Sequence, residues 1–295
     1  MRFPYPFLVL CTALMCSCSQ ELPNIAEPLR QGNLVLTVDP ATGGRINSLT
    51  YHGREMLAQS SALDQMNWGS TLWVSPQSSW DWPPPDSFDT KPFAFEQSAD
   101  GIALLGPVDK EKTGLRLRKA IHLPGGDRVQ LSYALENPSE HPVPAAGWEV
   151  TRVPIDGLVV FARAAEPVWW SFGGFAVQEF GDLVWVDARE PLAEGKLNAN
   201  GRGWLAWVSG RQLFIKRFAD LSAADQAPNE AEIQVYVSPR GYMELEAQGA
   251  YREIAPGQQL PFTTEWQLVT LPDDVEADVD SPSLQTLLQS LGLQL

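Results

Sequence analysis

Hydrophobic and polar positions alternate with a period of two along most of this chain, from about residue 33 to residue 271. Such alternation is typical of β-strands that bury one face. Examples are the segments "TGLRLRKAIHLPGGDRVQLSYALEN", "GWLAWVSGRQLFIKRF" and "AEIQVYVSPRGYMELEAQ". The 24 prolines and 23 glycines are spread throughout, and no strand–helix–strand rhythm is visible. The pattern predicts an all-β protein with more strands than an immunoglobulin-like sandwich, built as a large sandwich of two broad antiparallel sheets.

The C-terminal segment departs from this alternation. The acidic stretch "LPDDVEADVDSP" predicts a weakly structured connection, and leucines then recur at helical spacing in "SPSLQTLLQSLGLQL". Ser281 suits an N-cap and Pro282 the first helical position. We expect a short amphipathic helix that docks on the sandwich, with partner binding as the alternative. The predicted organisation is a signal segment at 1–18, a linker at 19–32, the sandwich at 33–272, and the acidic linker with its helix at 273–295.

The N-terminus carries one basic residue, Arg2, followed by a short apolar run and small residues. The run is too short to span a bilayer and is typical of a secretory signal. The motif "MCSC" resembles a bacterial lipobox, which implies lipidation at Cys18, with Cys16 as a competing site. An ordinary cleaved signal is the alternative. We therefore expect an exported periplasmic protein that is held at the outer membrane only by a lipid anchor.

The composition of the chain argues against two classes of binding partner. The net charge is −15, which argues against nucleic acid and anionic lipid because both require clustered Lys and Arg. No cysteine follows Cys18, so the exported part cannot rely on disulfides and must be stabilised by its core. No metal-ligand spacing, P-loop or nucleophile-elbow motif is present, and we expect no cofactor. Protein partners are left open by the sequence.

Candidate chemistry is concentrated in the strand "YMELEAQ". Alternation places Tyr242, Glu244, Glu246 and Gln248 on one face. A phenol, two carboxylates and an amide in one row suit a ligand rich in hydroxyl groups, and one carboxylate could act as a general base. A solvated outer face of the sheet is the alternative interpretation.

The segment "LEAQ", followed by "APGQQLPFTTEWQL", resembles the C-terminal signature of the aldose 1-epimerases, or galactose mutarotases. The stretches "LTVDPATGGRINSLTYHGREML" and "SYALENPSEHPVPAAGWEVTRV" are similar to the opening hairpin and central strands of that family, in the same order. The resemblance implies the β-supersandwich of the mutarotase-like superfamily. It also places the catalytic base of the family at Glu246.

The chain departs from the family where the catalytic acid is expected. The position of the histidine that protonates the ring oxygen falls at or beside Trp148, and no histidine is near it. His122 shares a predicted strand face with two arginines and is a candidate site residue, although it could equally be solvated. Lys216, between Phe214 and Phe218 on one strand face, is a candidate replacement acid that would pair with Glu244 or Glu246.

The segment "QSSWDWPPPDS" is a candidate sugar-binding loop. A tryptophan face at Trp80 or Trp82 would pack against a pyranose, Asp81 would bind hydroxyls, and the prolines would keep the loop rigid. Packing in the core or at a sheet edge is the alternative for these tryptophans. We expect an exported carbohydrate-binding protein that lacks standard epimerase chemistry. A sugar epimerase with a non-histidine acid, and a structural envelope lipoprotein whose groove binds protein, remain alternatives.

Overall fold

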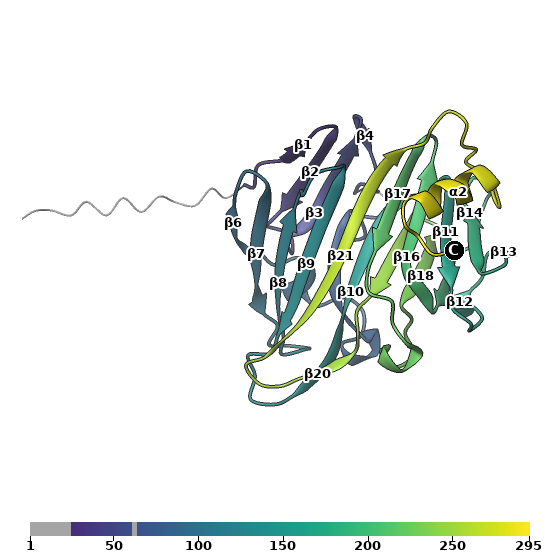
Figure 1. Ribbon diagram of the computed structural model, residues 1–295. Helices are drawn as coiled ribbons and strands as arrows, with labels where there is room; N and C mark the ends of the chain where they lie inside the picture. The colour runs from purple at the N-terminus through teal and green to yellow at the C-terminus, as the bar shows by residue number, and fades with distance from the viewer. Residues whose placement is uncertain (1–24, 61–63) are drawn as a thin grey trace, which may run out of the picture.

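The computed structural model describes residues 25–60 and 64–295. The predicted signal segment and both candidate lipidation sites, Cys16 and Cys18, lie outside the described residues. Within the described residues, two large antiparallel sheets are stacked as layers (Figure 1). The all-β prediction and the sandwich of two broad sheets are therefore confirmed.

The first sheet has 11 strands among the described residues. Its central strands come from distant parts of the chain and pair antiparallel. In spatial order its strands are β1 (Leu29–Gln31), β2 (Leu34–Asp39), β3 (Arg45–Tyr51), β5 (Ser70–Ser75), β10 (Val143–Pro154), β19 (Tyr242–Gln248), β18 (Ile233–Ser238), β15 (Gly195–Ala199) and β12 (Trp169–Gly173), with β4 (Arg54–Glu55) beside β3 and β20 (Arg252–Ile254) beside β10.

The second sheet has 10 strands in the described part of the chain. It lies in front of the first sheet in Figure 1. Its spatial order is β13 (Gln178–Phe180), β14 (Leu183–Asp187), β11 (Leu158–Arg163), β16 (Gly201–Ser209), β17 (Gln212–Arg217), β21 (Gln259–Thr270), β9 (Arg128–Glu136), β8 (Arg116–His122), β7 (Gly101–Val108) and β6 (Ala94–Gln97).

The main core fills the space between the two sheets. Strand β19 shows how alternation builds it, because Met243, Leu245 and Ala247 belong to this core while the intervening residues point to the other face of the first sheet. Burial of an apolar side chain such as Leu245 contributes about 1.5–3 kcal/mol. The same alternation that forms the core therefore presents Glu244 and Glu246 on the opposite face.

The C-terminal helix α2 (Pro282–Ser290) covers the outer face of the second sheet, as predicted. The Ser281 side chain accepts a hydrogen bond from the backbone N–H of Leu284, and Leu284 and Leu288 are buried in a second apolar cluster against β16 and β17. The remaining helical elements are short: α1 (Asp86–Asp89) and the 3₁₀ turns η1 (Gln77–Ser79) and η2 (Ala223–Asp225). Among the described residues no helix has the length and apolarity needed to cross a membrane.

Candidate functional site

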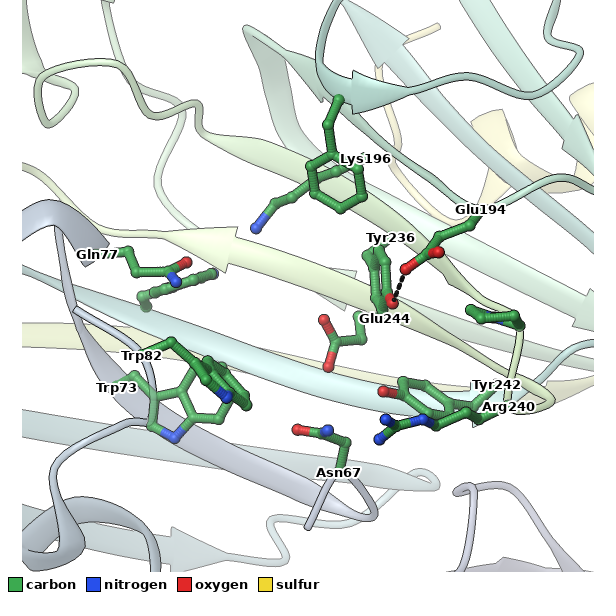
Figure 2. Close-up of a pocket in the computed structure, with 13 residues that line it drawn as sticks. Asn67, Trp73, Gln77, Trp82, Glu194, Lys196, Tyr236, Arg240, Tyr242 and Glu244 are labelled. Carbon is green, nitrogen blue, oxygen red and sulfur yellow. Dashed lines mark hydrogen bonds between the residues drawn. The ribbon is translucent and has the colours of Figure 1, made fainter. Parts of the chain in front are cut away.

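A cavity of about 470 Å³ opens on the face of the first sheet that points away from the main core (Figure 2). Its volume lies in the range of roughly 300–1,000 Å³ that is usual for small-molecule sites. Aromatic and polar side chains share the lining, and we call this cavity the tryptophan pocket. It is lined by Asn67, Trp73, Gln77, Trp82, Trp148, Phe172, Glu194, Lys196, Tyr236, Pro239, Arg240, Tyr242 and Glu244.

The floor of the tryptophan pocket is a row of residues that pair across four strands. Glu244 on β19 lies opposite Tyr236 on β18, Tyr236 lies opposite Lys196 on β15, and Lys196 lies opposite Phe172 on β12. Partners in register share one face of an antiparallel sheet, so these side chains converge on the pocket. The predicted row on β19 is real, but only Tyr242 and Glu244 of its four members line the cavity.

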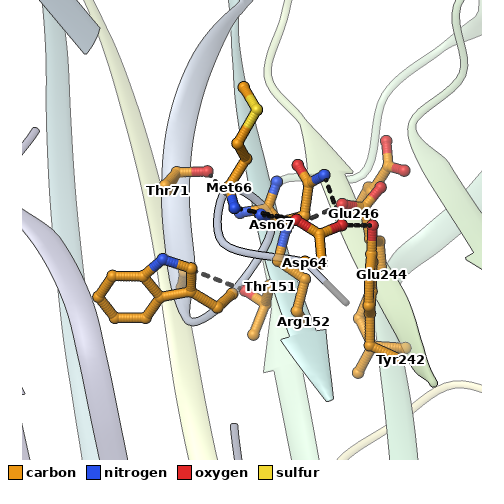
Figure 3. A network of polar contacts seen from close by, with 12 residues as sticks. Asp64, Met66, Asn67, Thr71, Thr151, Arg152, Tyr242, Glu244 and Glu246 are labelled. Carbon is orange, nitrogen blue, oxygen red and sulfur yellow. Dashed lines mark hydrogen bonds and ion pairs between the residues drawn. The ribbon is translucent and has the colours of Figure 1, made fainter. Parts of the chain in front are cut away.

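Glu244 is held in place by a buried ion pair. The guanidinium Nε of the fully buried Arg152 donates to Glu244 Oε1 at 2.8 Å, and Nη1 of Arg152 donates to the Thr71 hydroxyl (Figure 3). The indole ring of Trp73 also packs against this guanidinium, whose carbon lies 4.8 Å from the ring centre. Arg152 therefore fixes the carboxylate of Glu244 on the pocket floor.

Glu246 is fully buried below this floor. Its Oε2 accepts hydrogen bonds from Trp148 Nε1 at 2.6 Å and from Lys196 Nζ at 3.0 Å, while Oε1 has no hydrogen-bond partner in the described structure. Burial raises the pKa of Glu246 to about 7, against the lowering effect of the Lys196 ammonium. The carboxylate that the resemblance equates with a catalytic base is thus covered by two side chains and does not line the pocket.

Four tryptophans at the edge of the pocket form one cluster of ring contacts, Trp73, Trp80, Trp82 and Trp148. Trp80 and Trp82 have different roles in it. Trp80 is buried, donates its indole N–H to the Val74 carbonyl at 2.6 Å and does not line the cavity. Trp82 is 48% exposed and packs edge-on against Trp73, with ring centres 5.9 Å apart. The structure therefore presents Trp82 to a ligand and uses Trp80 for packing.

Asp81, between these two tryptophans, is exposed but is not part of the pocket lining. Its backbone has a positive φ of 57°, and its carboxylate accepts the backbone N–H of Trp82 at 2.8 Å. Asp81 shapes the turn that presents Trp82, because Asp tolerates this left-handed conformation better than most residues.

Lys216 lies between the two sheets rather than in the pocket. Its Nζ contacts Glu149 Oε1 at 2.9 Å and donates to the Leu245 carbonyl at 2.7 Å, and both charged side chains are fully buried. Burial lowers the pKa of Lys216, although Glu149 opposes that change. The expected pairing of Lys216 with Glu244 or Glu246 is wrong, because those carboxylates point to the other face of the first sheet.

Two further predicted residues also lie away from the cavity. Gln248 is buried beyond Glu246, where it accepts from the Ser75 hydroxyl and donates to Glu230. His122 lies on β8 of the second sheet, half-exposed, with Nδ1 3.6 Å from Asp100 Oδ2. His122 therefore cannot reach a ligand in the tryptophan pocket. Among the described residues, no group of three or more His, Cys, Asp or Glu is arranged to hold a metal ion.

Lys196, Tyr236, Glu194 and Arg240 are the main lining residues that the sequence analysis missed. Tyr236 donates its hydroxyl to Glu194 Oε1 at 2.9 Å. The ammonium of Lys196 lies 4.5 Å from the ring centre of Trp148, a cation–π contact. The segment "GKLNA" did carry a signal, since Lys196 alternates with buried apolar positions as Glu244 does on β19.

A second polar network closes one side of the pocket. The buried Asp64 carboxylate accepts from the backbone N–H groups of Met66 and Asn67 and from Arg240 Nη1, and the Tyr242 hydroxyl lies 3.3 Å from it (Figure 3). Burial opposes ionisation of Asp64, but the hydrogen bonds from Asn67, Met66 and Arg240 outweigh it and hold the pKa well below its usual range. Asp64 thereby orients Arg240 at the pocket wall.

Comparison with solved structures places this architecture in a known class. An E. coli candidate aldose 1-epimerase matches at 13% identity and TM-score 0.59, covering 83% of this chain and 98% of that one. A galactose mutarotase-like protein from Lactobacillus casei matches at 10% identity and TM-score 0.58, covering 82% of this chain and 99% of that one. Another from Clostridium acetobutylicum matches at 8% identity and TM-score 0.56, covering 83% of this chain and 95% of that one. No protein-family model and no curated protein matches by sequence. The chain therefore has the galactose mutarotase-like fold, a β-supersandwich, as the resemblance implied.

Proposed function

We propose that this chain is an exported carbohydrate-binding protein of mutarotase-like fold that lacks standard epimerase chemistry. The observation that carries the proposal is the tryptophan pocket, in which the exposed Trp82 faces a floor of fixed polar groups led by Glu244. An indole face packs against the C–H surface of a pyranose, and carboxylate, amide and phenol groups bind its hydroxyls. The buried Arg152 pair holds Glu244 before any ligand arrives, which lowers the entropy cost of binding.

The loss of epimerase chemistry is supported by the groups around Glu246. Opening a pyranose requires one group that removes a proton and another that donates one. The position at which the resemblance expects a histidine falls at or beside Trp148, and an indole N–H donates hydrogen bonds without exchanging protons at neutral pH. Glu246 is already bonded to Trp148 and Lys196 below the floor, so a bound sugar meets neither partner of the usual pair.

The direct test is tryptophan fluorescence of residues 19–295, titrated with glucose, galactose, mannose and N-acetylglucosamine. We expect a saturable shift with at least one of them, lost in Trp82→Ala. Trp169→Ala is the matched control, because Trp169 is also exposed but does not line the pocket. If no sugar produces a shift, the carbohydrate proposal is wrong and the structural envelope lipoprotein that binds protein becomes the better hypothesis.

A second candidate function is a sugar epimerase in which Lys196 replaces the histidine. It is favoured by one observation, since the Lys196 ammonium both lines the pocket and contacts Glu246 at 3.0 Å. Lys216 cannot take this role, because it is sealed between the sheets. Polarimetry of freshly dissolved α-glucose and α-galactose separates the two functions. Binding without faster mutarotation supports the binding protein, whereas acceleration lost in Glu246→Gln supports the enzyme.

We also propose that the protein is periplasmic and anchored to the outer membrane through a lipid on Cys18. The support is the lipobox-like "MCSC" segment. Metabolic labelling with a radioactive fatty acid, followed by membrane fractionation, tests the anchor in the full-length chain. Cys18→Ala is expected to abolish the label while Cys16→Ala retains it; the reverse result would assign the lipid to Cys16.

A further inference from the structure

A second cavity, of about 340 Å³, adjoins the tryptophan pocket on the same face of the protein. The two cavities share three lining residues, Asn67, Arg240 and Tyr242, so they are direct neighbours, and we treat them together as one groove. We call the added part the second compartment. Its remaining lining is Glu55, Leu57, Ala58, Gln59, Asp64, Pro154 and Gly241.

Arg240, which lines both compartments, has hydrogen-bond donors that a ligand could use. The Arg240 side chain is 55% exposed, and Nη1 donates to Asp64 at 2.9 Å. Within residues 25–60 and 64–295, its Nε and Nη2 have no hydrogen-bond partner, so these N–H groups remain available. Gln59 contributes an exposed side chain to the second compartment; its Nε2 already donates to the Asn47 and Leu57 carbonyls, so its Oε1 is the atom that can accept from a ligand. Guanidinium and amide groups suit the hydroxyls of a further sugar unit.

The charges of the groove favour an uncharged ligand. Its lining cations are already paired, Lys196 with Glu246 and Arg240 with Asp64, and Glu244 on the floor is neutralised by Arg152. Glu194 has no cationic partner in the described part of the chain and accepts only the Tyr236 hydroxyl. Glu55 in the second compartment likewise has no cationic partner among the described residues, since its carboxylate accepts only from Ser48, Leu49 and Leu57. An anionic sugar, such as a uronic acid or a sugar phosphate, would therefore add a negative charge to a groove that already holds two carboxylates without a cationic partner.

We propose that the groove binds a neutral oligosaccharide of at least two sugar units. One unit lies against Trp82 in the tryptophan pocket, and the next lies beyond Arg240 in the second compartment. Each compartment is itself within the usual size range of a small-molecule site, so a single sugar leaves one of them empty. This inference rests on the proposed carbohydrate-binding function and names its ligand class.

Isothermal titration calorimetry on residues 19–295 tests the proposal through ligand length. The probes are glucose, galactose, mannose and N-acetylglucosamine, with maltose, cellobiose, mannobiose and chitobiose as their dimers and lactose, which joins galactose to glucose, as a mixed dimer. We expect at least one dimer to bind about tenfold more tightly than its monomer, as two or three further hydrogen bonds would allow. Glucuronic acid is expected to bind more weakly than glucose.

Substitutions test whether the second compartment provides the tighter binding of the dimer. Gln59→Ala, which changes only the second compartment, is expected to cut the affinity for the dimer at least threefold, and Arg118→Ala on the second sheet is the exposed control. Equal affinities for monomers and dimers, or a tighter fit for glucuronic acid, would overturn this inference while carbohydrate binding stands. Binding by none of these sugars would overturn both the inference and the proposed function.

Discussion

Replacing Lys196 with Met tests whether the ammonium of Lys196 keeps the buried Glu246 ionised. Met preserves the length of the aliphatic stem against Trp148 but removes the charge that lies 3.0 Å from Glu246 Oε2. Since Lys196 lowers the pKa of Glu246, that pKa rises above its present value of about 7 in the variant. The expected consequence is a loss of stability that depends on pH.

The sign of this dependence follows from proton uptake. The pKa of an unfolded glutamate is near 4.5. Between pH 4.5 and about pH 7, the folded state therefore retains a proton on Glu246 that the unfolded state has released, in wild type and variant alike. Above pH 7 the folded wild type ionises Glu246, whereas the folded variant keeps it protonated. The variant therefore loses up to about 1.4 kcal/mol per pH unit relative to wild type, or about 2 kcal/mol at pH 8.5.

Thermal unfolding at pH 5.5 and pH 8.5 measures this difference. For a chain of this size about 2 kcal/mol corresponds to a Tm lowered by roughly 3–4 °C, and we expect that decrease at pH 8.5 and little change at pH 5.5. The double variant Lys196→Met with Glu246→Gln is the control, because it has no carboxyl to titrate and should lose the pH-dependent part. An equal decrease at both pH values would refute the proposed role of Lys196.

Three further substitutions separate packing from binding. Trp80→Ala removes a buried side chain and is expected to cost about 3–5 kcal/mol in urea unfolding, whereas Trp82→Ala should cost much less and abolish sugar-induced fluorescence changes. A small stability loss in Trp80→Ala would contradict its assignment to packing. Leu288→Ala should destabilise by about 2–5 kcal/mol while leaving sugar affinity unchanged, because α2 docks on the sheet remote from the pocket. An altered affinity in Leu288→Ala would show that the helix supports the site.

The parts of the site that could be predicted from sequence are those set by local alternation. The polar face of β19 and the docking face of α2 follow from periods of 2.0 and 3.6 residues, which need no knowledge of the neighbours. The direction of Trp80 and Trp82 could not be obtained this way, because they lie beside the 3₁₀ turn η1 and a proline-rich loop with no fixed period. Packing against Trp73 decides which indole is exposed.

The pairing of charged residues was beyond local reasoning for a different reason. Two phenylalanines on the strand face of Lys216 favour its burial, but its partner depends on which face of β17 turns toward the first sheet and on the register of β10, which supplies Glu149. Lys196 reaches Glu246 only because β18 lies between β15 and β19 in a fixed register. Such contacts join residues about 50 or more positions apart, and alternation alone carries no information about them.

The most direct test of the central claim is a crystal structure of residues 19–295 with the sugar that binds most tightly. We expect density for a sugar ring packed on Trp82, with hydroxyls hydrogen-bonded to Glu244 and with Glu246 still bonded to Trp148 and Lys196 below it. A sugar bound outside the tryptophan pocket, or one in direct contact with Glu246, would contradict the account.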